Sequence, residues 1–145
     1  MFDESPLARL LEHPALWRGR SAAQLPTWPT GFPALDASLP GGGWPRAGLV
    51  EILTPRLGIG ELHLLLPALA RLTGLVPARW IAWIAPPLDL FAPGLAARGV
   101  ALDRQLIVRT AMPLWAMEQA LDSGACEAAL AWAHEARPRS LRRLQ

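Results

Sequence analysis

The sequence predicts an α/β fold of three layers, in which helices cover both faces of a mainly parallel sheet. Two observations predict it. Apolar segments of strand character alternate along the chain with segments of helical periodicity, which is typical of parallel sheets. The stretch from Thr30 to Leu66 also has the order strand, glycine-containing loop, helix, which is how phosphate-binding loops are built.

The first half of this pattern starts with a strand expected at Leu49–Leu53, followed by a loop at Thr54–Gly60. A helix is expected at Glu61–Leu72 because its leucines recur at helical spacing, and Pro67 should kink or split it. The next segment, Arg79–Ala85, is almost entirely apolar, as expected for a central strand that is covered on both sides.

The second half continues the alternation up to the last helix. A helix is expected around Leu90–Arg98, a strand at Gln105–Arg109, a helix at Pro113–Asp122, a strand at Glu127–Ala133 and a short helix from Pro138. Proline at a helix start and glycine just after a helix end are the expected boundary residues. Since the sequence stops two turns into the last helix, we expect that more chain normally follows.

The domain organisation is predicted as an N-terminal helical arm, residues 1–23, and one core domain, residues 24–145. The arm is interpreted either as a short helix folded onto the core or as a docking arm for another subunit, which would also allow self-association. In the docking interpretation the contact residues are Leu16, Trp17 and Arg18. Trp28 and Trp44, in a Pro- and Gly-rich segment, are further interface candidates because Trp is a preferred interface anchor.

The charge is unevenly distributed. The sequence pI is about 9.9, yet residues 1–136 hold ten Arg and twelve acidic residues. The last nine residues add four Arg and no acid, namely Arg137, Arg139, Arg142 and Arg143. This cluster is a candidate contact for DNA or a protein partner, and a solvated helix face is the alternative.

The location predicted from the sequence is the cytoplasm. A lone Cys126 leaves no internal disulfide, which fits a reducing compartment. The start of the chain lacks the features of a signal peptide, and no apolar run is long enough to span a membrane.

The loop after the first strand lacks the chemistry of a phosphate site. A working loop has the pattern G-x-x-x-x-G-K-[ST], whereas the corresponding residues here are Pro55, Gly58, Gly60 and Glu61, and the chain contains no Lys at all. The Glu61 carboxylate would repel a triphosphate. The three His are far apart in sequence and give no metal-ligand spacing. We therefore expect no enzymatic activity, no cofactor and no metal.

Several long motifs carry a resemblance to a known family: Thr30-Gly31-x-x-x-Leu35-Asp36, LPGGGWPRAGLVEIL, GIGELHLLLPALARL, WIAWIAPP and WAMEQALDSGACEAALAW. They resemble the ImuA family, RecA-like accessory proteins of bacterial translesion synthesis. It implies a RecA-like fold with a degenerate P-loop, in which Trp132 stands at the Walker B aspartate and Pro86-Pro87 near the catalytic glutamate. The implied function is that of a non-catalytic adaptor in SOS-induced mutagenesis, and the implied partners are an ImuB-like inactive polymerase, an error-prone polymerase and RecA.

The last three of these motifs also resemble the SulA family, SOS-induced inhibitors of the division GTPase FtsZ. That resemblance implies the alternative function, in which the protein binds FtsZ and blocks its polymerisation. An active RecA-type recombinase is a third class, and the missing lysine argues against it. The sequence therefore favours the adaptor, with the division inhibitor as the alternative.

Overall fold

The computed structural model describes residues 26–77, 79–133, 136 and 138–144 of the chain. The chain divides into two compact units, Met1–Ala47 and Gly48–Gln145, and each is described by itself. The predicted arm, residues 1–23, lies outside the described residues, so the boundary at residue 23 stays a prediction.

The first unit contains a minimal antiparallel sheet. Strand β1, Thr27–Trp28, pairs with β2, Trp44–Pro45, so that Trp28 lies opposite Trp44. Gly43 is required by this close approach, because a Cβ there would lie 2.3 Å from the carbonyl oxygen of Trp28. The strands are too short to be predicted from an alternating pattern.

A short helix between these strands is held by polar contacts within the segment. Helix α2, Pro33–Asp36, is followed by the 3-10 turn η1, Pro40–Gly42. The backbone amide of Thr30, a buried residue, donates to Oδ1 of Asp36 at 2.8 Å. The Thr30-to-Asp36 motif therefore has a structural role here, since its two polar residues close the turn on each other.

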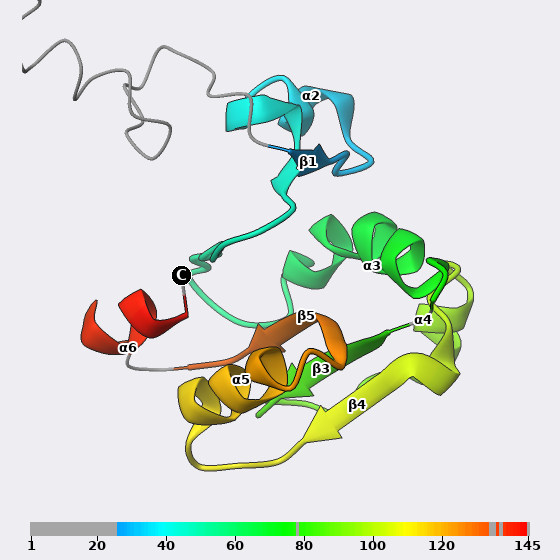
Figure 1. Ribbon diagram of the computed structural model, residues 1–145. Helices are drawn as coiled ribbons and strands as arrows, with labels where there is room; N and C mark the ends of the chain where they lie inside the picture. Colours follow the sequence, from blue (N-terminus) through cyan, green and yellow to red (C-terminus); the bar gives the residue numbers. More distant parts are fainter. Residues whose placement is uncertain (1–25, 78, 134–135, 137, 145) are drawn as a thin grey trace, which may run out of the picture. The chain divides into compact units, whose positions relative to one another are not determined.

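The second unit is built around a three-stranded parallel sheet with the order β4-β3-β5 (Figure 1). The strands are β3, Trp80–Ile84; β4, Gln105–Val108; and β5, Cys126–Ala131. Residues 81–84 of the central strand are fully buried. These three strands confirm the predicted positions, because apolar runs of this length form the centre of a parallel sheet.

Helices lie on both sides of β3. Ala82 and Ile84 point to the face covered by α5, Pro113–Asp122, and form a cluster with Ala116 and Cys126. Helix α3, Leu66–Thr73, also packs against β3 and buries Leu69 and Leu72. The remaining elements are the 3-10 turns η2, Glu61–Leu64, and η3, Leu102–Arg104, and the helices α4, Ala92–Ala96, and α6, Pro138–Arg143.

The helix boundaries largely follow the sequence signals. Helix α5 has the predicted bounds, and Gly124, with a φ of 65°, lies just after it. The predicted Glu61–Leu72 helix is divided into η2 and α3, with Pro67 at the beginning of α3, as expected for a residue that lacks an amide donor. Within the described residues, no helix is long and apolar enough to cross a membrane.

The predicted strand at Leu49–Leu53 is wrong. This segment is not a strand, and Val50, Ile52 and Leu53 are exposed, Leu53 by 83%. It begins where the two compact units divide, and no strand of the described chain pairs with it. An apolar pattern predicts extended backbone, but a strand also needs a neighbour to satisfy its backbone groups.

The prediction of a RecA-like three-layer fold is therefore corrected as well. The parallel sheet has three strands, and it lacks the strand that should lead into the phosphate loop. The other sheet in the described chain is the separate β1–β2 pair. The architecture is a small α/β sheet with a minimal antiparallel pair, without the strand that would define a P-loop.

Candidate functional site

The degenerate phosphate loop forms a tight turn that bonds to its own carboxylate. Gly58 and Gly60 have φ angles of 77° and 104°, a region that favours glycine. The amide of Gly58 donates to Oε1 of Glu61 at 3.2 Å. Pro55 is exposed in the same loop. The loop thus has glycines at two left-handed positions, and the Glu61 side chain accepts the hydrogen bond from the Gly58 amide.

The electrostatics of the loop agree with this geometry. Hydrogen bonds from the backbone amides of Glu61 itself and of Gly58 hold the pKa of the Glu61 carboxyl below its ordinary value. Burial acts in the opposite direction and is the smaller effect. The carboxylate is therefore ionised at neutral pH and places a negative charge where a nucleotide phosphate would have to bind.

The position of the Walker B aspartate is filled by an indole. Trp132 follows β5 and stacks on Trp83, with ring centroids 6.2 Å apart and planes 15° from parallel. Trp83 is fully buried, and its indole nitrogen donates to Oε1 of Gln105 at 2.6 Å. This part of the sheet is an aromatic core that offers no carboxylate to a metal ion.

A metal centre has no support among the described residues, since no group of three or more His, Cys, Asp or Glu could hold an ion. His63 lies on η2, where its Nδ1 is 2.8 Å from Nη1 of Arg98. Cys126 is buried, and burial raises the pKa of its thiol.

The predicted interface tryptophans of the first unit lie together. Trp28 and Trp44 are half-buried and face each other across β1 and β2. The guanidinium of Arg46 lies 4.2 Å from the ring centroid of Trp28, a cation–π contact. Leu16, Trp17 and Arg18, the other predicted interface residues, lie outside the described residues.

The predicted basic cluster is not one uniform surface. Arg143 in α6 bonds to Oε1 of Glu118 in α5, with its Nε at 3.0 Å. This ion pair connects the two helices, whereas Arg139 and Arg142 are exposed. Arg137 lies outside the described residues. Any contact with DNA or a partner through these arginines stays a prediction.

The sequence analysis missed several large apolar side chains that are exposed. Large apolar side chains lie exposed on the segments that follow β3 and β4, with Phe91 exposed by 73%. We call this set the carboxyl-edge surface, because its members follow the carboxyl ends of β3 and β4 in the sequence; they are Leu88, Phe91, Met112 and Trp115. An ion pair between Asp89 and Arg109 connects the two segments that carry them.

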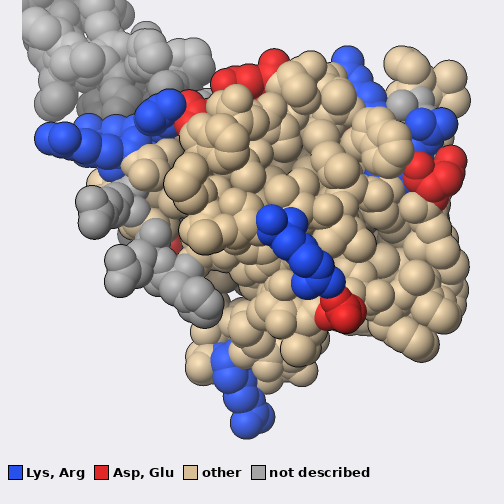
Figure 2. All heavy atoms as spheres, turned by 90° about the horizontal axis from the view of Figure 1, so that it is seen from below, with Lys and Arg blue, Asp and Glu red and all other residues tan. Residues whose placement is uncertain are grey.

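Figure 2 looks onto the side of the second unit where β4 and α5 lie, and it shows broad areas of uncharged atoms with few charged side chains. Large exposed apolar patches on a folded domain mark interaction sites. The sequence could have pointed to these residues only through their position along the chain, directly after predicted strands. Binding sites of parallel sheets lie beyond the carboxyl ends of the strands. The fold therefore defines a class: a small α/β protein with a three-stranded parallel sheet and large exposed apolar side chains, in whose described residues no group of three or more His, Cys, Asp or Glu could hold a metal ion.

Comparisons with known proteins narrow this class. No protein-family model matches the sequence. Over 73 residues the chain is 37% identical to the cell division inhibitor SulA of Pectobacterium carotovorum and, equally, to that of Pectobacterium atrosepticum. The match covers 48% of this chain and 42% of each relative, so the chain matches less than half the length of these relatives.

A solved structure shows the same likeness. The crystal structure of SulA from Pseudomonas aeruginosa resembles the described fold with a TM-score of 0.55 and 28% sequence identity, over 66% of this chain and 82% of the SulA chain. The chain is thus similar to SulA in sequence and in fold.

These findings correct the resemblance to ImuA. The relatives found are SulA proteins, so the predicted adaptor role in translesion synthesis and mutagenesis is wrong, as are the predicted polymerase and RecA partners. Three of the quoted motifs fit both families, whereas the lead-in, Thr30–Pro45, and the arm residues Leu16-Trp17-Arg18 favoured ImuA. That lead-in belongs to the separate first unit, where Thr30 and Asp36 have a structural role.

Proposed function

We propose that the protein is a SulA-like inhibitor of cell division, which binds the division GTPase FtsZ and blocks its polymerisation. The observation that carries this proposal is the agreement of sequence and fold, with 37% identity to two SulA proteins and a TM-score of 0.55 to a third. The SulA-like motifs quoted above lie in the second unit, which also contains the carboxyl-edge surface.

The inhibitor acts by binding and has no catalytic activity of its own. Two features support this part of the proposal: the ionised Glu61 in the phosphate loop and the stacked Trp132 at the Walker B position. Phosphoryl transfer requires a cation that neutralises the phosphate and a carboxylate at the Walker B position for Mg²⁺. The Glu61 carboxylate cannot neutralise a phosphate, and the Trp132 indole cannot hold Mg²⁺. FtsZ assembles in the cytoplasm, and we place the protein there as well.

The carboxyl-edge surface is the proposed contact with FtsZ. Phe91 and Trp115 are large, exposed and uncharged, and aromatic side chains dominate the energetics of protein interfaces. The Asp89–Arg109 ion pair lies on the same two segments, and it is exposed. Because covering an ion pair costs solvation energy, the apolar side chains and not this pair are proposed to supply the binding energy.

The surface is tested by direct binding to FtsZ, in the GDP form, where polymerisation does not interfere. We expect Phe91→Asp and Trp115→Asp each to weaken binding about 30-fold, the effect of removing one energetically dominant contact. The matched control is Leu53→Asp, which places the same charge at another exposed apolar position of the same unit. Absence of binding by the unsubstituted protein contradicts the proposed function, whereas equal binding by all variants contradicts the surface alone.

A further inference from the structure

Phe91 is exposed by 73%, yet its backbone is held at the start of helix α4. Its carbonyl oxygen accepts two hydrogen bonds, from the amide of Gly94 at 3.0 Å and from the amide of Leu95 at 3.2 Å. Leu95 itself is buried. The Phe91 side chain therefore projects from a backbone position that is already ordered before a partner binds.

The ring of Phe91 lies over the place where a side chain of residue 94 would be. A Cβ atom added at Gly94 would lie 2.8 Å from Cδ1 and 3.4 Å from Cε1 of this ring. Carbon atoms in favourable contact are about 3.5–4.0 Å apart, so even the methyl group of alanine does not fit under the ring. The ring in its present orientation and a side chain at position 94 exclude each other.

The backbone at Gly94 does not itself require glycine. Gly94 lies inside α4, Ala92–Ala96, and its φ is not in the left-handed region that favours glycine. Glycine inside a helix lowers stability relative to alanine, because it loses more conformational freedom on folding. The feature that favours glycine at this position is the space that the Phe91 ring occupies.

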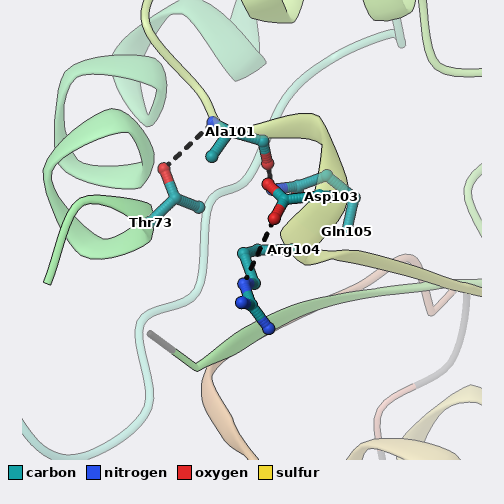
Figure 3. Close-up of polar contacts among 5 residues, drawn as sticks. All are labelled: Thr73, Ala101, Asp103, Arg104 and Gln105. Carbon is teal, nitrogen blue, oxygen red and sulfur yellow. Dashed lines mark hydrogen bonds and ion pairs between the residues drawn. The ribbon is translucent and has the colours of Figure 1, made fainter. Parts of the chain in front are cut away.

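The chain is anchored shortly after α4, which fixes the support under the ring. The amide of Ala101 donates to the hydroxyl oxygen of Thr73 in α3 at 3.2 Å. The carbonyl of Ala101 accepts from Nε2 of Gln105 in β4 at 2.7 Å. Figure 3 shows both contacts, together with the ion pair of Asp103 and Arg104. The segment that carries the ring is thus attached to a neighbouring helix and to the sheet.

We propose that Gly94 is a positioning residue for the FtsZ contact: because it carries no side chain, it lets the Phe91 ring rest in the orientation that the partner receives. The inference rests on the proposed function, in which Phe91 belongs to the contact surface. An aromatic side chain that is fixed before binding loses less freedom when a partner covers it, so it contributes more to affinity. Gly94 acts on the partner through Phe91 alone.

Binding to FtsZ in the GDP form tests this role. We expect Gly94→Ala to weaken binding about fivefold, because the displaced ring has to be ordered again on binding. Its urea midpoint should equal or exceed that of the unsubstituted protein, because alanine favours the helix. A purely structural role of Gly94 would lower stability together with binding. Gly94→Ala that binds as tightly as the unsubstituted protein overturns the inference and leaves the proposed function intact.

The matched control is Gly74→Ala, just after α3. The φ of Gly74 is −90°, and an added Cβ would meet two backbone oxygens at 3.5 and 3.6 Å, which is ordinary contact. Gly74→Ala should therefore leave binding to FtsZ unchanged. An equal loss of affinity in Gly74→Ala and Gly94→Ala would contradict a specific role of Gly94.

A double-mutant cycle shows whether Gly94 acts through the ring. In the Phe91→Ala background the ring is absent, so the further substitution Gly94→Ala should change binding by less than about twofold. A fivefold loss in this background as well would mean that Gly94 acts by another route, and it would overturn the proposal.

The packing of the ring on Gly94 can be measured by NMR without FtsZ. An aromatic ring shifts the resonances of the nuclei that it covers, so the α-proton resonances of Gly94 should move when Phe91→Ala removes the ring. Unchanged resonances overturn the inference, whatever the binding data show. A clear change, in a protein that does not bind FtsZ, would contradict the proposed function and the role of Gly94 in it, while the packing itself would be established.

Discussion

The carboxylate of Glu61 accepts a hydrogen bond from the amide of Gly58, across the loop that precedes the 3-10 turn η2. Glu61 is the first residue of the following 3-10 turn, so its side chain folds back and bonds to the backbone of the loop before it. The loop retains glycines at two left-handed positions, because the turn itself requires them.

The first prediction concerns the pH dependence of this contact. The folded pKa of Glu61 is lowered, so its contribution to stability is present above the ordinary pKa of about 4.5 and is lost as the pH falls through the folded value. We expect Glu61→Gln to lower stability at pH 7 by about 0.5 kcal/mol, the lower end for an exposed hydrogen bond. Urea denaturation of both proteins at pH 7 and below pH 4 measures this difference in the free energy of unfolding. A difference between the two proteins that grows on acidification would contradict this assignment.

The second prediction concerns the buried indole of Trp83. Its N–H donates to Gln105, and Gln105→Leu would leave this donor buried without a partner. We expect a loss of about 1–3 kcal/mol in the free energy of unfolding, measured by urea denaturation. Gln119→Leu, at an exposed position of α5, is the matched control and should change stability by less than about 0.5 kcal/mol. Equal losses of stability in the two variants would show that the hydrogen bond between Trp83 and Gln105 does not stabilise the fold.

The third prediction concerns Cys126. The thiol is buried between β5 and α5, and its raised pKa keeps the thiolate fraction small. We expect a disulfide reagent to modify the native protein slowly at pH 8 and the urea-unfolded protein rapidly. In Leu53→Cys the added exposed thiol should react in a separate fast phase. A single fast phase in the unsubstituted native protein would show that Cys126 is accessible.

Much of the second unit could be predicted from the sequence, because its signals are local. Pro113 marks the start of α5 and Gly124 lies just after its end, and the apolar run at Trp80–Ile84 forms the central strand. These features depend on residue type within a few positions. The sequence also showed that the loop lacks the lysine of a phosphate-binding loop, because the chain contains no Lys.

The errors arose where structure depends on distant residues. Leu49–Leu53 has the composition of a strand, but composition does not specify a neighbouring strand, and the segment is exposed. The carboxyl-edge surface was missed for a related reason: whether Phe91 or Trp115 is buried depends on what covers it. The family was misassigned because the lead-in motif received more weight than the three motifs that SulA shares.

The measurement that tests the central claim most directly is the GTP-dependent polymerisation of FtsZ, followed by sedimentation in the presence of this protein. We expect the polymerised fraction to fall in proportion to the added chain and to be abolished near equimolar ratio, and we expect the Phe91→Asp variant to inhibit less than the Leu53→Asp control. An unchanged FtsZ pellet at equimolar ratio, with protein shown to be folded, would contradict the proposal that this chain is a division inhibitor.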